Sequence, residues 1–572
     1  MRRTTLLLLS ALVASCTDSP ADDIGADGTL DPLPPPGKED GQYHAGLSTS
    51  ADTSKTDVWK VVNQWEDKDT PAAQQAGMAW PANSGLTWDQ KFGKWVESFE
   101  WTPSVDGYNT TYKLTTPWGK TLPAPQLECA ETALFLRVAF ASWYGLPLQF
   151  EAQDGHGTTI YFGHFGVRTQ AGKYSGMPDF AVQYKDYTGT DTSTSWPQDA
   201  TLRQRIIHGG DDTQTELAQG AVFGTYMDEI MLNKRVGYFT TIVLDYLGSA
   251  NLADTANTYN LQPEAMLPGD LLLERWQKSG IGHTLVVKEV TPLTSATVDV
   301  TLVSGSMPRR QGAKETGQSA KETFTGQYTG GPGMNSDGDA YVKLGGGLKR
   351  FRVAKAVNGY WTNTWMNGDE AHWINSTDYA TLSARPARFD SLLGQVPLDQ
   401  QRTELLARIA DARHHLSQYP ASCSAREERE LAFKDLYDVE YQLSQKGTVQ
   451  VDQEQRTLED YVFGELDYSH SKTCCWDSTT AAMHDIVMAA ARDEQAQATA
   501  NQTCVAPTVF AADSSGSYQM WAGYAAAHGQ SAAWLAYHDD EDCTQRMVTT
   551  DTIVDVSSTE TAFCSLAPPP AM

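Results

Sequence analysis

Several features that mark common protein classes are missing from this chain of 572 residues. After residue 15 no run of eighteen apolar residues occurs, so no membrane-spanning helix is expected. HExxH, paired-cysteine zinc motifs, GxGxxG and GxxxxGK[ST] are also absent, and we expect neither a metal cofactor nor a nucleotide. Positive charge is scarce, with 43 Lys and Arg against 71 Asp and Glu, which argues against a nucleic-acid partner.

What the chain does contain is enough apolar sequence for two or three folded units. Hydrophobic residues make up 40% of it, and the length exceeds that of one compact core. The stretch from 16 to 55 is rich in Asp, Gly and Pro and predicts a flexible tether. Changes in pattern divide the rest into a mixed unit, 56–393, and a mainly helical unit, 394–572.

The first fifteen residues have the layout of an export signal. Arg2 and Arg3 precede a short apolar run, and Val13-Ala14-Ser15 leads to Cys16. This pattern resembles the bacterial lipoprotein signal, which implies that Cys16 is lipidated and that the chain is anchored in the cell envelope, facing the periplasm or the cell exterior. The alternative is an ordinary secretory signal followed by a chance cysteine.

One helix and one strand carry the candidate chemistry. The segment from Glu128 to Tyr144 lacks Gly and Pro and is apolar on nearly every side, which predicts a buried helix with Cys129 in its first turn. The helix N-terminus favours a thiolate there, whereas Glu128 and Glu131 oppose it, and the sequence leaves the outcome open.

The partner candidate for Cys129 is His283. Pro268-Gly269-Asp270 predicts a turn before a strand, and His283 follows Gly282 at the start of a second strand. A third strand is expected over 297–303, which places His283 in the middle strand of an antiparallel sheet.

A cysteine that opens a buried helix, followed by Gly269-Asp270, a strand, Gly282-His283 and two strands, resembles the NlpC-type and CHAP-type amidases of the papain-like superfamily. The resemblance implies an α+β papain-like fold in which Cys129 is the nucleophile and His283 the general base. The separation of 154 residues between them implies a large insertion, and Glu128 stands where the family often has Asp.

The residue that orients the histidine is expected on the next strand. Asp299 is the predicted third member, with Ser304 and Ser306 as the other polar candidates there. His164 is the second choice for the base. The alternative is a purely structural role for each residue: Cys129 would be a core residue, and the histidine would be a residue in a turn.

The later parts of the chain suggest packing rather than chemistry. Trp361, Trp365 and Trp373 could stack on sugars, although a packing role is favoured. Beyond Pro397, apolar spacing predicts two helices that form a hairpin, with Ser424 to Glu427 as a capping box for the second. Six cysteines in this unit predict three disulfides of open connectivity: Cys423, Cys474, Cys475, Cys504, Cys543 and Cys564.

Taken together, the sequence predicts a lipid-anchored cysteine amidase or peptidase that needs no cofactor. Its expected substrates are cell-envelope amide bonds such as those of peptidoglycan peptides. The alternatives are an envelope lipoprotein without catalytic activity, which binds a glycan or a protein, and an inactive relative of the amidases.

Overall fold

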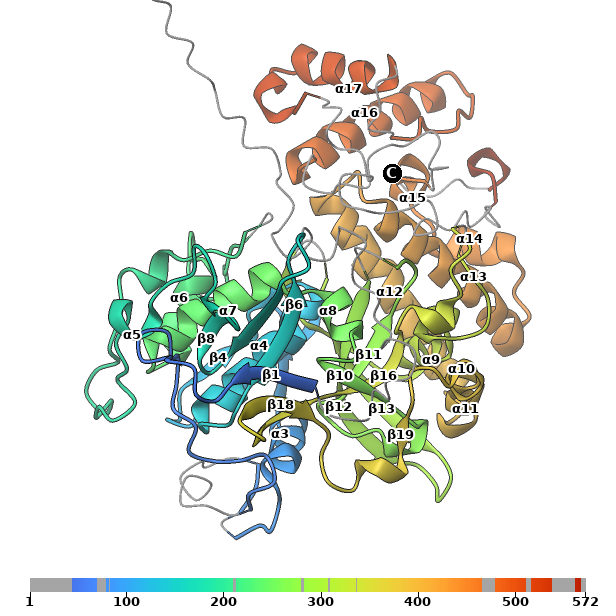
Figure 1. Ribbon diagram of the computed structural model, residues 1–572. Helices are drawn as coiled ribbons and strands as arrows, with labels where there is room; N and C mark the ends of the chain where they lie inside the picture. The colour runs from blue at the N-terminus through green and yellow to red at the C-terminus, as the bar shows by residue number, and fades with distance from the viewer. Residues whose placement is uncertain are drawn as a thin grey trace, which may run out of the picture.

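The computed structural model describes most of the chain and shows a mixed α+β protein (Figure 1). Among the described residues, no helix is long and apolar enough to cross a membrane. The predicted signal, Cys16 and most of the tether lie outside the described residues. The description covers 44–68, 79–81, 83–208, 212–278, 282–306, 309–335, 337–464, 479–510, 516–536 and 561–566.

A seven-stranded antiparallel sheet forms the centre of the α+β part. The predicted strands are present as β11 (Leu271–Glu274), β12 (His283–Pro292) and β13 (Val298–Ser304). Their hydrophobic alternation fills two cores, because Val286 packs on one face of the sheet and Leu285 on the other. The strand order is β15-β13-β12-β11-β16-β10-β19, with β15 (Ala313–Glu315), β16 (Gly347–Phe351), β10 (Thr258–Leu261) and β19 (Trp373–Ile374).

The predicted central helix is α4 (Cys129–Trp143), and it packs against β12. Thirteen consecutive residues of α4 are buried, which explains why its sequence is apolar on every side. The opposite face of the sheet is covered by α9 (Gly317–Thr325) and α11 (Arg385–Leu392). The remaining helices of this part are α3 (Trp88–Glu97), α5 (Phe180–Gln183), α6 (Phe223–Ile230), α7 (Lys234–Tyr246), α8 (Ser249–Ala253) and α10 (Tyr379–Ser383).

Four smaller sheets surround this centre, and each is antiparallel. One of them joins the N-terminal strand to a hairpin more than three hundred residues later, since β1 pairs with β18. The sheets are β1-β18-β17 (His44–Ser48, Tyr360–Thr364, Val353–Val357), β2-β3-β4 (Glu100–Pro103, Thr110–Thr115, Thr121–Pro123), β6-β7-β8-β9 (Gln149–Gln153, Thr159–Gly163, Gly166–Thr169, Gly172–Lys173) and β14-β5 (Arg310–Gln311, Gln126–Leu127).

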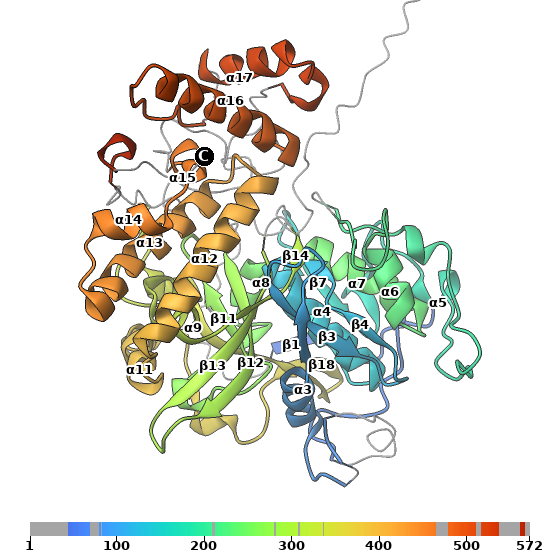
Figure 2. The ribbon, with the colours of Figure 1, turned by 180° about the vertical axis from the view of Figure 1, so that it is seen from behind.

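The C-terminal part is helical, and its first helix packs against α9, which covers one face of the central sheet (Figure 2). The predicted hairpin is present as α12 (Leu398–Gln418) and α13 (Cys423–Ser444). The expected capping box at Ser424 is wrong, because α13 begins earlier and the Ser422 hydroxyl accepts the cap hydrogen bond from the Ala425 N–H. The other helices are α14 (Thr448–Gln455), α15 (Leu458–Val462), α16 (Ala481–Ala500) and α17 (Gly516–Ala527).

Of the three predicted disulfides, the described residues contain one, between Cys504 and Cys564. It closes a loop of 60 residues and ties the segment after α16 to the C-terminal end of the described chain. Cys474, Cys475 and Cys543 lie outside the described residues, as does the side chain of Cys423.

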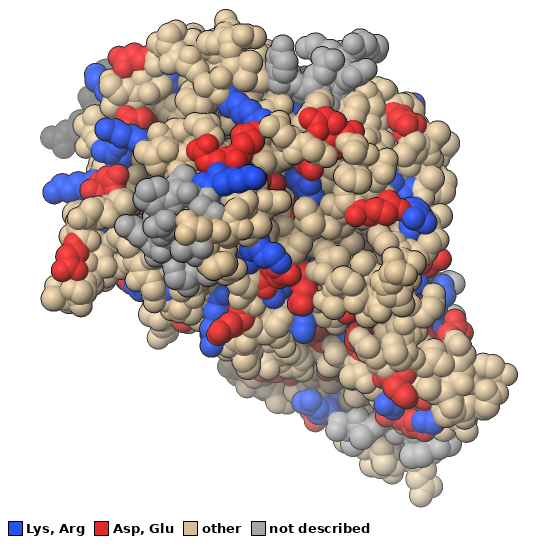
Figure 3. All heavy atoms as spheres, turned by 90° about the horizontal axis from the view of Figure 1, so that it is seen from below, with Lys and Arg blue, Asp and Glu red and all other residues tan. Residues whose placement is uncertain are grey.

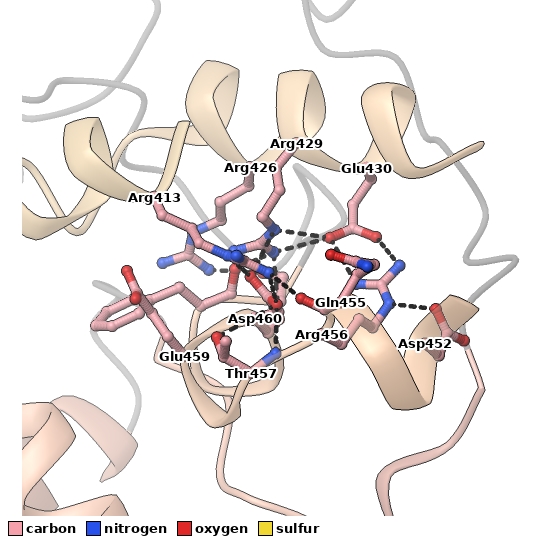
Figure 4. A network of polar contacts seen from close by, with 12 residues as sticks. Arg413, Arg426, Arg429, Glu430, Asp452, Gln455, Arg456, Thr457, Glu459 and Asp460 are labelled. Carbon is pink, nitrogen blue, oxygen red and sulfur yellow. Dashed lines mark hydrogen bonds and ion pairs between the residues drawn. The ribbon is translucent and has the colours of Figure 1, made fainter. Parts of the chain in front are cut away.

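A buried network of charges holds the helical part together (Figure 4). Arg456 bonds Glu430 at 2.7 Å and Asp452 at 2.9 Å, which connects α13 to α14. Arg413 on α12 bonds both oxygens of Asp460 on α15, at 2.9 and 2.6 Å. Most of these groups are buried, so the stability of the helical part depends on keeping each carboxylate paired with its arginine.

Candidate functional site

Cys129 is the first residue of α4, as expected from its sequence context. Glu131 caps this end of the helix, since its carboxylate accepts a hydrogen bond from the Glu128 N–H at 2.8 Å. The side chain that caps the helix therefore lies two residues after Cys129 in the sequence.

The Cys129 thiol contacts the backbone on both sides of His283. Its sulfur lies 3.7 Å from the Gly282 carbonyl oxygen, to which it donates. The Thr284 N–H also faces the sulfur and favours the thiolate. The structure therefore brings the helix N-terminus to the start of β12, although no hydrogen bond joins the thiol to the His283 ring among the described contacts.

The thiol is protonated at neutral pH. Its exposed fraction is 6%, and burial, together with the Glu128 carboxylate, raises the pKa of Cys129 to about 12. The effect of the helix N-terminus, which was the opposing influence in the sequence, is therefore outweighed. A thiolate at this site requires a base that takes the proton.

Carboxylates and one arginine surround this end of α4. Arg309 bonds Glu131 through two nitrogens, at 2.9 and 2.7 Å, and lies 4.0 Å from Glu128. Burial raises the pKa of Asp212 and Asp245 to about 7 each, despite the Arg309 charge. Arg309 therefore offsets much of the negative charge next to the thiol.

Arg275 is a second cation near the thiol, and sequence reasoning did not identify it. Its side chain is fully buried, and burial lowers its pKa to about 10. It bonds the Ser249 hydroxyl at 3.0 Å and approaches Gly282, where a side chain would collide with it. Because Gly282 has no side chain, the Arg275 guanidinium and the Cys129 thiol can both approach the backbone at Gly282.

His283 is held by a hydroxyl group. Its Nε2 lies 3.1 Å from the Ser304 Oγ on β13. Burial, together with the charge of Arg310, lowers the pKa of His283 to about 4, so the ring is neutral at pH 7. A neutral imidazole has one nitrogen that can accept a proton, which is what a general base needs.

The Glu315 carboxylate faces the Ser304 hydroxyl group. Glu315 on β15 shares a sheet face with Ser304, because Leu302 is its direct cross-strand partner and Ser304 is two residues further on. The Ser304 hydroxyl faces the Glu315 carboxylate and favours its charged form, although burial raises the pKa of Glu315 overall. Ser319 on α9 donates to the same carboxylate at 3.0 Å.

Asp299, the expected third member, is at the other end of the hairpin. It pairs with Thr291, eight residues along β12 from His283, which is about 27 Å in a strand. Its place close to the hairpin loop prevents it from orienting the His283 ring. Of the three polar candidates, Ser304 is the one whose side chain contacts the His283 ring.

His164, the second choice for the base, lies beyond the opposite end of α4. Its Nδ1 interacts with the Leu148 carbonyl at 3.1 Å, and its ring packs edge-on against Trp361 at 4.3 Å. Because α4 has 15 residues, its two ends are about 22 Å apart. Burial lowers the pKa of His164 to about 4 and accounts for its neutral packing role.

The Pro268-Gly269-Asp270 turn has a structural explanation of its own. Gly269 has φ of 90°, and a side chain there would meet the Phe92 ring at 2.8 Å. Asp270 binds Arg350 at 2.6 and 2.8 Å. A cavity of about 220 Å³ adjoins this turn and α3, but Cys129 and His283 do not line it.

The aromatic residues that were considered for sugar binding divide into two packing groups. Trp365 and Trp373 stack on each other with ring centroids 5.6 Å apart, and both pack against the core on the α9 side. Trp361 packs elsewhere, against His164. These contacts agree with the packing role that was favoured.

No family model, curated protein or solved structure matches this chain. Among the described residues, no group of three or more His, Cys, Asp or Glu side chains is arranged to hold a metal ion. On the face shown in Figure 3, Lys and Arg are interspersed with Asp and Glu. The candidate site therefore stands on its own geometry.

Proposed function

We propose that this chain is an exported, lipid-anchored cysteine hydrolase of papain-like type that cleaves amide bonds of the cell envelope. The observation that carries the proposal is the position of the Cys129 sulfur, 3.7 Å from the Gly282 carbonyl and facing the Thr284 N–H. These two backbone groups flank His283 in the sequence, so the thiol lies at the start of β12, while the His283 side chain points to the Leu285 face of the sheet.

The proposed reaction starts from a neutral thiol and a neutral imidazole. His283 takes the Cys129 proton as the sulfur attacks the scissile carbonyl carbon, and the Cys129 backbone N–H binds the oxyanion. The C–N bond then breaks, and His283 returns the proton to the leaving amine. Water, deprotonated by His283, hydrolyses the thioester and restores the thiol.

The substrate class follows from the resemblance to NlpC-type and CHAP-type amidases and from the predicted lipid anchor. Peptide cross-links of peptidoglycan are amides that a protein tethered in the envelope reaches. We therefore place the protein at the envelope, with its folded parts facing the periplasm or the cell exterior.

Turnover on purified peptidoglycan tests the proposal. The release of new amino groups is followed for the wild-type chain, for Cys129→Ala and for Asp299→Asn. We expect Cys129→Ala to abolish turnover, because the thiol is the nucleophile. Asp299→Asn is the matched control and retains wild-type turnover, since its side chain lies about 27 Å along the hairpin from His283.

A protein without catalytic activity, which binds a glycan or a protein in the envelope, is the second candidate. The low exposure of Cys129, 6%, favours it, because a substrate carbonyl must reach the sulfur. Equal turnover by the wild-type chain and Cys129→Ala, or no turnover by either, rejects the hydrolase and leaves this candidate.

A further inference from the structure

The cavity between α3 and the Pro268-Gly269-Asp270 turn has apolar walls and opens to solvent. Leu267 lines it and is 49% exposed, so small molecules can enter on that side. A cavity of about 150 Å³ holds benzene, so about 220 Å³ suits a molecule about half as large again, such as leucine. The apolar part of the lining consists of Leu86, Phe92, Leu267, Pro268 and Phe351.

Arg137 on α4 is a buried cation in the lining of this cavity, and it has too few acceptors. Its side chain is 1% exposed, and its guanidinium lies over the Trp65 ring, 3.7 Å from the centroid. That contact occupies a face of the guanidinium and leaves the N–H groups at its edge for hydrogen bonds. Among the described residues they reach one acceptor, Asp89 Oδ1, which is 3.4 Å from Nη1 and from Nη2, while Nε has no partner. Unmet donors on a buried guanidinium are costly, which points to an acceptor from outside the chain.

Asp89 on α3 is the anion beside this cation, and it also has capacity left. Its side chain is 15% exposed, and its Oδ2 accepts no hydrogen bond among the described contacts. The other arginine in the lining differs, because Arg350 bonds Asp270 at 2.6 and 2.8 Å and Asp369 at 3.0 Å. The Arg137–Asp89 pair is therefore the one that can bind a ligand.

The spacing of this pair selects the kind of ligand. The edge of a guanidinium binds a carboxylate, and a carboxylate such as Asp89 binds an ammonium group. Because Arg137 and Asp89 are 3.4 Å apart, the two ligand groups must also be neighbours, as they are on the α-carbon of an amino acid. A zwitterion adds no net charge to the cavity, which avoids the cost of burying an unpaired ion.

We propose that this cavity binds a free α-amino acid with an apolar side chain, its carboxylate on Arg137 and its ammonium group on Asp89. The side chain of the ligand lies against the apolar lining, where it is removed from water. Cys129 and His283 do not line the cavity, so the proposal is independent of the hydrolase function.

Isothermal titration calorimetry on the full wild-type chain tests the ligand class. L-leucine and D-leucine are titrated, followed by 4-methylpentanoate, which lacks the amino group, and 3-methylbutylamine, which lacks the carboxylate. The last probe is 6-aminohexanoate, an isomer of leucine whose charged groups lie at opposite ends. We expect a leucine enantiomer to bind, and each of the other three compounds to bind at least about tenfold more weakly. The proposal is overturned if neither enantiomer binds, or if any of the other three binds as tightly.

Variants of the chain test the two anchoring residues. We expect Arg137→Met and Asp89→Asn each to weaken leucine binding at least about tenfold, because each removes a charge that the ligand pairs with. Lys94→Met is the matched control: it removes a cation from the same lining, but one that is 51% exposed and paired with Glu97. Circular dichroism verifies that each variant is folded, and the titrations of the wild-type chain decide the proposal without any variant. Unchanged affinity in Asp89→Asn, or an equal loss in Lys94→Met, overturns it.

Discussion

Cys129 is subject to two influences of opposite sign. The first turn of α4 offers N–H groups that favour a thiolate, whereas burial and the Glu128 carboxylate favour the thiol and raise its pKa to about 12. The second influence dominates because a charge in an apolar core loses its hydration. The thiol therefore stays protonated at neutral pH unless a base takes its proton.

Slow alkylation of the resting thiol follows from this balance. A pKa of about 12 against about 8.5 for an unfolded cysteine leaves roughly three orders of magnitude less thiolate at pH 7.5. We expect iodoacetamide to modify Cys129 far more slowly in the native chain than in urea, with a rate that rises about tenfold per pH unit up to pH 11.

Peptide mapping by mass spectrometry identifies the modified residue, with Cys129→Ser as the blank. A native rate equal to the unfolded one, or a rate that is flat between pH 7 and 9, would contradict a buried thiol of raised pKa.

At the scale of elements, local pattern predicted α4, β11, β12, β13, α12 and α13. Each has an apolar period that is visible within its own sequence. The sheet order could not be predicted in this way, because β16 pairs with β11 and β10 pairs with β16, and these segments lie far apart in the sequence. Such contacts leave no mark in local periodicity.

The candidate site, too, could be predicted only in part from local sequence patterns. The sequence predicted that Cys129 and His283 form a pair; the thiol lies against the Gly282 carbonyl, and no described hydrogen bond joins it to the His283 ring. Polarity alone favoured Asp299 on β13, whereas the register places Ser304 beside His283. No sequence pattern indicated Glu315, because it comes near Ser304 only through the pairing of β15 with β13.

The buried network between α13 and α14 has a predictable cost when it is broken. Arg456→Met leaves Asp452, which is 0% exposed, without its cation, and it removes one of the two arginines that bond Glu430, which is 5% exposed. We expect a loss of about 3–5 kcal/mol in the free energy of unfolding, measured in urea by circular dichroism.

Arg388→Ala is the matched control. Its partner is Glu264, and the two side chains are 57% and 38% exposed, so the expected loss is below about 1 kcal/mol. Losses of similar size in the two variants would mean that the network in Figure 4 is not stabilising in the way proposed.

At the scale of the whole molecule, the helical part is docked on the α+β part by polar contacts along α12. Asp411 binds Arg310 at 3.2 Å and Asn109 at 2.9 Å, and Glu404 accepts from the Gln318 N–H at 2.7 Å. Arg408 binds Glu322 on α9 at 2.6 Å. These contacts lie on the side of the sheet that carries Glu315 and α9.

The predicted anchor is also a property of the whole chain. We expect Cys16→Ala to lose incorporation of radiolabelled palmitate in bacterial expression and to move from the membrane fraction to the soluble fraction, because acyl chains on Cys16 supply the membrane affinity. Ser15→Ala keeps the cysteine and a small residue before it, and serves as the control. Equal labelling of Cys16→Ala and the wild-type chain would reject lipidation at this residue.

The docking of α12 has a consequence for how the chain can be divided. Arg310 both pairs with Asp411 of α12 and contributes to the low pKa of His283, and Glu428 of α13 acts on the charge of Glu315. An expression fragment that stops at the end of the α+β part would lose Asp411, the partner of Arg310, together with Glu428, and would change the environment of the imidazole. Fragments designed for enzymology or crystallisation therefore need the α12–α13 hairpin, even though the candidate nucleophile and base both precede it.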